Sequence, residues 1–195
     1  MKKFKENIDP NAFLAYNRIM SEQKSGKFGR ILRNVFLTAA SIAMLCWIFS
    51  NSLQTGSQSS EQSARITSWV QKIFRFFAPD SFVANATGAE YRKLHSVIRM
   101  LAHFAEFALL GALLGWTCLS YSRKTGYFAF TALLILLVPV VDEFLQMHTA
   151  GRGAELKDLL IDTAGGFAGL LFAGLTVWLG CAIARKKENE KEKGV

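Results

Sequence analysis

Four long apolar runs constrain the fold of this chain more than any other feature of its sequence. They cover about residues 31–50, 97–121, 127–148 and 156–184. About 20 consecutive apolar residues suffice for a helix to cross the hydrocarbon core of a bilayer. Backbone groups without hydrogen bonds are too costly in lipid, so such runs are expected to be helical. The sequence therefore predicts an all-α, polytopic membrane helix bundle with four transmembrane helices.

The composition argues against a soluble protein. Of the 195 residues, 51% are hydrophobic and 16 are Phe, and the charged residues are concentrated between the apolar runs. The net charge of +8 would suit nucleic acid, but the basic residues lie beside the runs, as in membrane proteins. We therefore expect no nucleic-acid partner. Three cysteines lie inside apolar segments at unrelated spacings, which indicates buried thiols and no disulfide or metal framework.

Polar segments flank the predicted transmembrane domain of residues 31–184. Residues 1–30 are basic, and Asp9-Pro10 is a helix-start signal. The residues that follow it form either a helix on the inner membrane surface or a loosely ordered tail. A cleaved signal peptide is disfavoured, because the polar lead is long and no small-residue cleavage site follows the first run. Residues 185–195 form a charged tail that we expect to be disordered.

The long connection of residues 51–95 contains a predicted amphipathic helix. Its beginning, up to Ser60, is interpreted as a polar turn. From Glu61 on, apolar and basic side chains fall on different sides of a helix, which is typical of a segment lying in the membrane interface. Trp69 suits the headgroup level. The stretch from Pro79 to Gly88 ends this helix.

The basic residues also predict a topology. They precede the first run, occupy the loop of residues 122–126 and follow the fourth run. The positive-inside rule then places both termini in the cytoplasm. The connection of residues 51–95, with its amphipathic helix, and the turn of residues 148–157 would face outward.

Ionisable residues gather at the predicted outward ends of the last three runs. Each charge placed in hydrocarbon costs about 2.5–3.5 kcal/mol even on the mildest scale, so such a group needs partners or a purpose. Residues spaced by three, four or seven positions share one face of a helix. This spacing predicts one polar site that consists of Arg99, His103, Glu106, Asp142, Glu143, Gln146, Arg152, Asp158 and Asp162.

Small residues on the fourth run indicate that its acidic face turns into the bundle. Gly165, Gly169 and Ala173 continue the stripe of Asp158 and Asp162 along the helix. Rows of small residues let membrane helices approach closely. The carboxylates of this run are therefore expected to face the neighbouring helices.

The predicted site carries more negative than positive charge, since only Arg99 and Arg152 face its five carboxylates. The residues could pair only with one another, with Arg152 bridging two acids, while Glu143, Gln146 and Asp158 act as solvated helix ends. Alternatively, crowding keeps some carboxylates protonated, or a divalent cation binds. Mg²⁺, Ca²⁺ or Mn²⁺ would suit an oxygen-rich site better than Zn²⁺. No other cofactor is predicted.

Several short motifs follow one another along residues 31–180. They are Phe49-Ser50-Asn51-Ser52 with Gln54, His103-Phe104 with Glu106, Asp142-Glu143-x-x-Gln146, Gly151-Arg152, Asp158, and Gly165 to Gly169. In this order they resemble the VanZ-like family of small bacterial membrane proteins, named after a teicoplanin-resistance protein. The resemblance implies a bacterial cytoplasmic membrane protein of the cell envelope and no particular chemical activity. At Arg99 and Asp162 the chain departs from the family pattern, where Lys and Asn are as readily expected.

Three functions are compatible with these features. The favoured one is a non-enzymatic envelope protein whose outward pocket binds a wall precursor, a lipid headgroup or a lipoglycopeptide, with the amphipathic helix as a lid. The second is an intramembrane enzyme that uses His103, Glu106 and Asp142, or a bound cation, on a lipid-linked phosphate or ester. It is disfavoured because no nucleophile motif, zinc-protease motif or phosphate-binding loop is present. The third, a transporter, is disfavoured by the apolar inner half of the runs. No oligomeric state is indicated.

Overall fold

In the computed structural model, the described part of the chain is helical apart from short connections, and no strand occurs in it. The structure describes the backbone of residues 10–121 and 125–192, and the side chains of residues 26–121, 126–180, 182, 183 and 186. The helices are α1 (Pro10–Ser52), α2 (Gly56–Phe77), α3 (Phe82–Asn85), α4 (Gly88–Tyr121), α5 (Thr125–Met147) and α6 (Leu156–Glu192).

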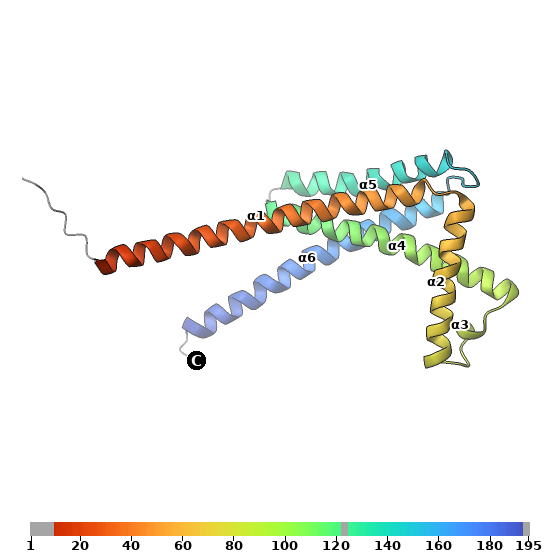
Figure 1. The fold of residues 1–195 in the computed structure, drawn as a ribbon, viewed down its shortest axis with the longest axis horizontal. Helices are drawn as coiled ribbons and strands as arrows, with labels where there is room; N and C mark the ends of the chain where they lie inside the picture. Colours follow the sequence, from red (N-terminus) through yellow and green to blue (C-terminus); the bar gives the residue numbers. More distant parts are fainter. Residues whose placement is uncertain (1–9, 122–124, 193–195) are drawn as a thin grey trace, which may run out of the picture.

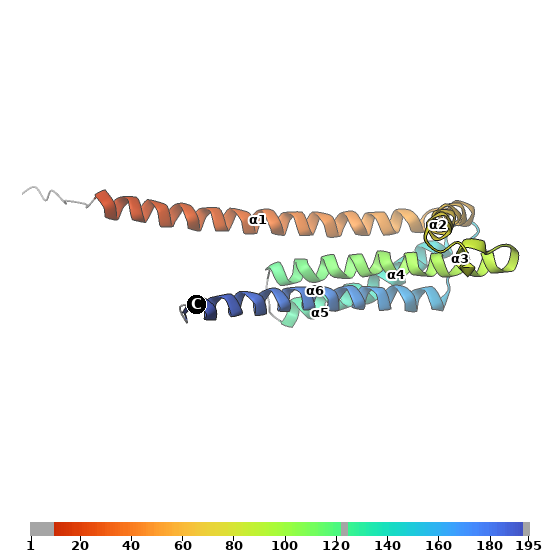
Figure 2. The same ribbon diagram turned by 90° about the horizontal axis from the view of Figure 1, so that it is seen from below.

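The four long apolar helices lie side by side, and α2 lies across one end of them (Figures 1 and 2). The beginning of α1 and the end of α6 lie at the opposite end of the bundle (Figure 1). The stretches that are long and apolar enough to cross a membrane are Gly26–Ser52, Gly88–Tyr121, Gly126–Met147 and Leu156–Gly180. The predicted all-α, polytopic membrane bundle is thus confirmed.

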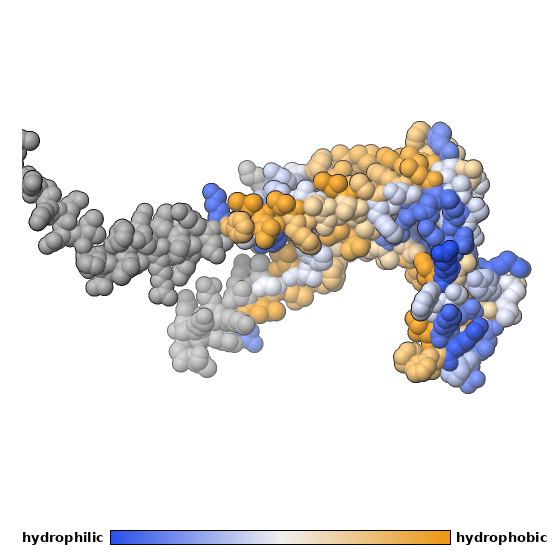
Figure 3. All heavy atoms as spheres, viewed as in Figure 1, coloured by the Kyte–Doolittle hydropathy of each residue, from blue (hydrophilic) through white to orange (hydrophobic). Residues whose placement is uncertain are grey.

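On the face seen in Figure 3, hydrophobic residues cover most of the length of the bundle, and hydrophilic residues gather at the end where α2 lies. Cys46 is exposed, so the prediction of a buried thiol is wrong for it. Cys46 lies on the face of α1 that points away from the other helices. In lipid, exposure of its thiol on this face costs little free energy. Cys118 is buried, as predicted.

Four helix boundaries differ from the prediction. The helix α6 continues to Glu192, so the prediction of a disordered tail is wrong for residues 185–192, whose Lys and Glu residues are good helix formers. The helix α1 extends from Pro10 to Ser52 without a break, so residues 10–30, before the first run, form neither the separate surface helix nor the loosely ordered tail that was expected. The helix α2 begins at Gly56, so the predicted polar turn is shorter than expected. A capping box explains this, because Thr55 and Gln58 each bind the other's backbone N–H, at 3.4 and 3.0 Å.

The helix α4 also begins earlier than predicted, at Gly88. Its first turns lie beside α2 and α3 at the end of the bundle (Figure 1). There Leu94 and Ile98 are buried and pack with Ala86 and Val70. The helix therefore begins earlier because its first turns are buried against other parts of the protein. A hydropathy pattern along the sequence does not reveal such contacts. Residues 1–9, the centre of the predicted basic loop (122–124) and the end of the predicted tail (193–195) lie outside the described residues.

The closest packing in the bundle joins α4 and α6. A Cβ atom added at Gly165 or Gly169 would meet the backbone carbonyl oxygen of Phe104 or Ala108. Ala173, one turn further on, is fully buried. The predicted role of the small residues as a helix-contact row is confirmed. This contact turns the same face of α6, with Asp162, toward α4.

Candidate functional site

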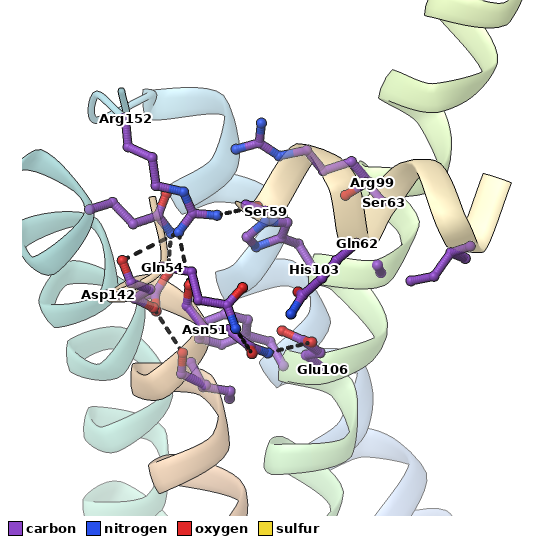
Figure 4. A pocket seen from close by; sticks show the side chains of 16 residues that line it. Asn51, Gln54, Ser59, Gln62, Ser63, Arg99, His103, Glu106, Asp142 and Arg152 are labelled. Carbon is purple, nitrogen blue, oxygen red and sulfur yellow. Dashed lines mark hydrogen bonds between the residues drawn. The ribbon is translucent and has the colours of Figure 1, made fainter. Parts of the chain in front are cut away.

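A polar pocket of about 70 Å³ lies where α2 crosses the end of the bundle. Its polar lining comes from α1, α2, α4, α5 and the α5–α6 turn (Figure 4). The residues are Asn51, Ser52, Gln54, Ser59, Gln62, Ser63, Arg99, His103, Glu106, Asp142, Gln146 and Arg152. Six of the nine residues that the sequence predicted for one site therefore line one pocket, and Glu143, Asp158 and Asp162 lie outside its lining.

Arg152 holds the α1–α2 corner against the α5–α6 turn. Its guanidinium donates hydrogen bonds to the carbonyl oxygens of Asn51 and Ser52, at 3.2 and 3.4 Å, and to the Ser59 hydroxyl at 2.7 Å (Figure 4). The last carbonyls of a helix have no partner within the helix, so they accept from Arg152. Burial, together with the charge of Arg99, lowers the pKa of Arg152 from its ordinary value.

The expectation that Arg152 bridges two acids is wrong for the part of the chain that the structure describes, since its hydrogen bonds go to neutral oxygens. The turn itself brings the guanidinium to this corner. Gly151 has a φ of +74°, a left-handed conformation that favours glycine. The amide of Gly56 donates to the carbonyl of Ala150 at 3.0 Å, which ties the turn to the start of α2.

Asp142 is buried with 1% of its surface exposed and is surrounded by neutral donors. The Ser52 hydroxyl donates to one of its carboxylate oxygens. The Gln146 amide, one turn further along α5, donates to the other at 2.6 Å. The carboxylate thus links the end of α1 to α5 and keeps a fixed orientation.

Glu106 connects α4 to α1 on the other side of the pocket. Its Oε1 accepts hydrogen bonds from the Asn51 amide at 3.1 Å and from the Trp47 indole at 3.4 Å. Asn51 therefore contributes its carbonyl to Arg152 and its side chain to Glu106, which joins the two ends of the pocket through one residue.

His103 lies between the carboxylates of two other helices. Its Nδ1 is 3.5 Å from Oδ1 of Asp162 on α6, but the pair lacks hydrogen-bond geometry. Asp162 is completely buried. Ligand atoms of His103, Asp142 and Asp162 all lie within 4.8 Å of one another, so the three residues could hold a metal ion.

Two further interactions lie near the start of α6, outside the pocket lining. Arg99 also reaches Asp158, with 3.9 Å between Nη2 and Oδ2. Glu143 accepts from the backbone amide of Glu155 at 3.0 Å, which caps the start of α6. The interpretation of Glu143 and Gln146 as solvated helix ends is wrong, because they are only 7% and 1% exposed. The α5–α6 turn and the α1–α2 corner cover them.

Six polar lining residues were not among the predicted site residues: Asn51, Ser52, Gln54, Ser59, Gln62 and Ser63. The first three belong to the motif after the first apolar run, which contributed to the family resemblance. The last three are spaced as one stripe of a helix. The interpretation of the residues up to Ser60 as a turn separated Ser59 from the predicted helix of Gln62 and Ser63, and this concealed the stripe.

Comparisons with curated proteins and with solved structures gave no significant match. A family model described as VanZ/LLP1 matches residues 21–177. The matched segment contains α2 to α5, most of α1 and α6, and every residue that lines the pocket. This chain, an integral membrane protein with four apolar helices, belongs to the VanZ/LLP1 family.

Proposed function

We propose that the chain is a protein of the bacterial cytoplasmic membrane whose pocket faces outward and binds an envelope precursor or lipid. By sequestering or altering that component it would contribute to teicoplanin tolerance. The observation that carries the proposal is the gathering of Arg152, His103, Glu106 and Asp142 beneath α2. Family membership supports the envelope role but supplies no ligand, so the ligand is inferred from the site.

The distribution of basic residues supports the outward orientation. Lys27, Arg30 and Arg33 lie near one end of the first spanning stretch, and Arg185 to Lys187 follow the last one. Both groups are at the end of the bundle away from α2 (Figure 1). Basic residues beside membrane spans favour the cytoplasmic side. The pocket would then open toward the cell wall, with both termini inside.

The helix α2 has the surface of a segment lying in the membrane interface. Its polar residues Ser63, Thr67 and Gln71 are buried toward the protein, whereas Trp69 and Phe76 are exposed. An apolar face turned away from the protein needs lipid to cover it, and Trp is enriched at the headgroup level. We infer that α2 lies along the outer membrane surface, directly above the pocket.

The size of the pocket indicates that α2 must move to admit such a ligand. A volume of about 70 Å³ holds about two water molecules, whereas pockets for whole ligands measure about 300–1,000 Å³. The helix is joined to the bundle by the hydrogen bonds of Ser59 with Arg152 and of Gly56 with Ala150, and by contacts with α4. A lid that opens within the membrane interface would expose Arg99, Glu106 and Arg152 to a headgroup carrying both charges.

Antibiotic susceptibility tests this role. In a teicoplanin-sensitive Gram-positive host, expression of the chain should raise the inhibitory concentration of teicoplanin several-fold. Asp142→Asn should abolish the increase, since it removes the charge and replaces one of the two oxygens that accept from Ser52 and Gln146 by a donor. Glu155→Gln is the matched control, because the exposed side chain lies outside the pocket lining and only its backbone binds Glu143.

Vancomycin is tested in parallel, and membrane levels of each variant are checked by blotting. Equal susceptibility of expressing and empty cells, at normal membrane levels, would contradict the tolerance role. Full teicoplanin tolerance in cells that express the Asp142→Asn variant would show that the tolerance does not depend on the pocket. The enzymatic alternative acts at the same residues, and its specific support is the arrangement of His103 and Glu106 within one pocket.

A further inference from the structure

Three side chains from three helices meet beside the pocket, and two of them, His103 and Asp142, also line it. His103 comes from α4, Asp142 from α5 and Asp162 from α6. Each provides one ligand atom within 4.8 Å of the other two, and the two aspartates are 1% and 0% exposed. The headgroup-binding role described above uses neither Asp162 nor the contact between these helices.

The cluster contains buried polar atoms without partners. Both carboxylate oxygens of Asp162 and Nδ1 of His103 make no hydrogen bond to any residue that the structure describes. Buried polar atoms in native proteins almost always have a partner, and an uncompensated buried charge is strongly destabilising. These atoms face one another across the cluster, with 3.5 Å between Nδ1 and Oδ1. What they lack is a partner between them.

The arginines of the site do not fill this gap. Arg152 is occupied by the carbonyls of Asn51 and Ser52 and by Ser59. Arg99 approaches Asp158 near the start of α6. Asp142 and Asp162 carry up to two negative charges in the interior of the bundle, with His103 close to both and the charge of Arg152 acting on Asp142 from a distance. A doubly charged cation would balance them.

We propose that His103, Asp142 and Asp162 bind one divalent transition-metal ion, through Nδ1 of the histidine and one oxygen of each carboxylate. A donor set of one imidazole and two carboxylates suits Mn²⁺, Fe²⁺ or Zn²⁺, whereas Mg²⁺ and Ca²⁺ favour oxygen ligands alone. The fold places the His103 imidazole beside the two carboxylates. The expectation of Mg²⁺ or Ca²⁺, which was based on an oxygen-rich site, is therefore replaced by that of a transition metal. Ligand atoms lie about 2.0–2.2 Å from such ions, so small side-chain rotations would close the site.

The surroundings of the cluster suit a metal site. Ser52 and Gln146 already orient the Asp142 carboxylate, as outer hydrogen bonds orient ligands in metalloproteins. The adjoining cavity of about 70 Å³ has room for about two waters, which would complete the coordination of an ion with three protein ligands. The present pocket, too small for a headgroup, is large enough for a hydrated ion.

This site shares His103 and Asp142 with the proposed headgroup pocket. Its test is independent of that role, because metal binding is measured on the purified protein without any envelope component. If the ion is present, it lies beside the pocket, where it could attract a phosphate and polarise it. It would thereby supply the Lewis acid that the enzymatic alternative lacks among the side chains.

The test is metal binding by the full-length chain purified in detergent. Bound metals are quantified by mass spectrometry, and metal-free protein is titrated with MnCl₂ and ZnCl₂. The expected result for the parent protein is one ion per chain. Asp162→Asn and His103→Gln should each weaken Mn²⁺ binding by about 100-fold or more, beyond the effect of losing an outer partner. Glu155→Gln, which removes a charge from the same end of the bundle, should bind as the parent does.

Electron-spin-echo spectroscopy of the Mn²⁺ complex gives a signature that nonspecific binding to acids would not produce. A nitrogen coupling from His103 is expected in the parent protein and should be absent in His103→Gln. Circular dichroism checks that each variant remains folded. If a variant is unfolded, the metal stoichiometry and the nitrogen coupling of the parent protein test the proposal. Absence of Mn²⁺ and Zn²⁺ binding by the parent, or unchanged binding by Asp162→Asn, would overturn the proposal. Preference for Mg²⁺ or Ca²⁺ would overturn the transition-metal assignment.

Discussion

Gly169→Leu is expected to disrupt the bundle and to lower its thermal midpoint strongly. An added Cβ at this position would meet the carbonyl oxygen of Ala108 and would approach the amide nitrogen of Ala112 to 2.7 Å. Backbone cannot rotate away as a side chain can, so α4 and α6 must separate. Overpacking costs about 1–3 kcal/mol even where side chains can yield, which corresponds to about 2–12 °C for a chain of this size. We expect a decrease at the upper end of this range or beyond it.

Gly174→Leu is the matched control, since an added Cβ at Gly174 has no atom of the described residues within 4 Å. Both variants place the same side chain on α6, so their helix propensities and hydrophobicity are equal. Circular dichroism in one detergent gives the two midpoints. Equal midpoints would contradict the close approach of α4 and α6, and with it the geometry that holds Asp162 against His103.

Arg152→Ala is expected to release α2 and the α5–α6 turn from the end of the bundle. The substitution removes hydrogen bonds from a charged donor to Asn51, Ser52 and Ser59. Hydrogen bonds of charged groups contribute about 1.5–3 kcal/mol each, and they are not additive, so a loss of about 3 kcal/mol is expected. Arg152→Lys should recover little, because an ammonium group lacks the planar fork that reaches three oxygens.

Arg65→Ala provides the comparison for this change. Arg65 also belongs to the region of α2, but it is exposed and pairs with Glu61 one turn away at 2.7 Å. Such helical surface pairs contribute only about 0.3–0.5 kcal/mol. Thermal midpoints and proteolysis within α2 are measured for both variants. Equal protease resistance of the Arg152→Ala variant and the parent would show that other contacts hold α2 in place.

The sequence predicts the membrane bundle well because hydropathy reports directly on burial in lipid. The sequence also predicts which faces of α4 and α6 turn inward. Arg99, His103 and Glu106 follow one helical stripe of α4. Gly165 and Gly169 mark the contact face of α6. These inferences require only the helical period and the preference for small residues between membrane helices. The structure then adds the depth and the partners of each side chain.

The contribution of α1 and α2 to the pocket could not be predicted from the same signals. Ser59, Gln62 and Ser63 are recognised as pocket residues only when α2 is known to cross the bundle. Arg152 was expected to pair with acids, because opposite charges attract, whereas the carbonyls of Asn51 and Ser52 at the end of α1 bind it instead. Both features depend on tertiary placement at helix ends, on which local sequence patterns carry no information.

The orientation of the pocket is the central claim, and cysteine labelling of intact cells tests it most directly. In a background with Cys46, Cys118 and Cys181 replaced by Ser or Ala, Gln62→Cys marks the pocket and Lys27→Cys marks the opposite end of the bundle. A membrane-impermeant maleimide should label Gln62→Cys in intact cells, and Lys27→Cys only after the cells are permeabilised. Labelling of Lys27→Cys but not Gln62→Cys in intact cells would place the pocket in the cytoplasm and contradict the envelope role.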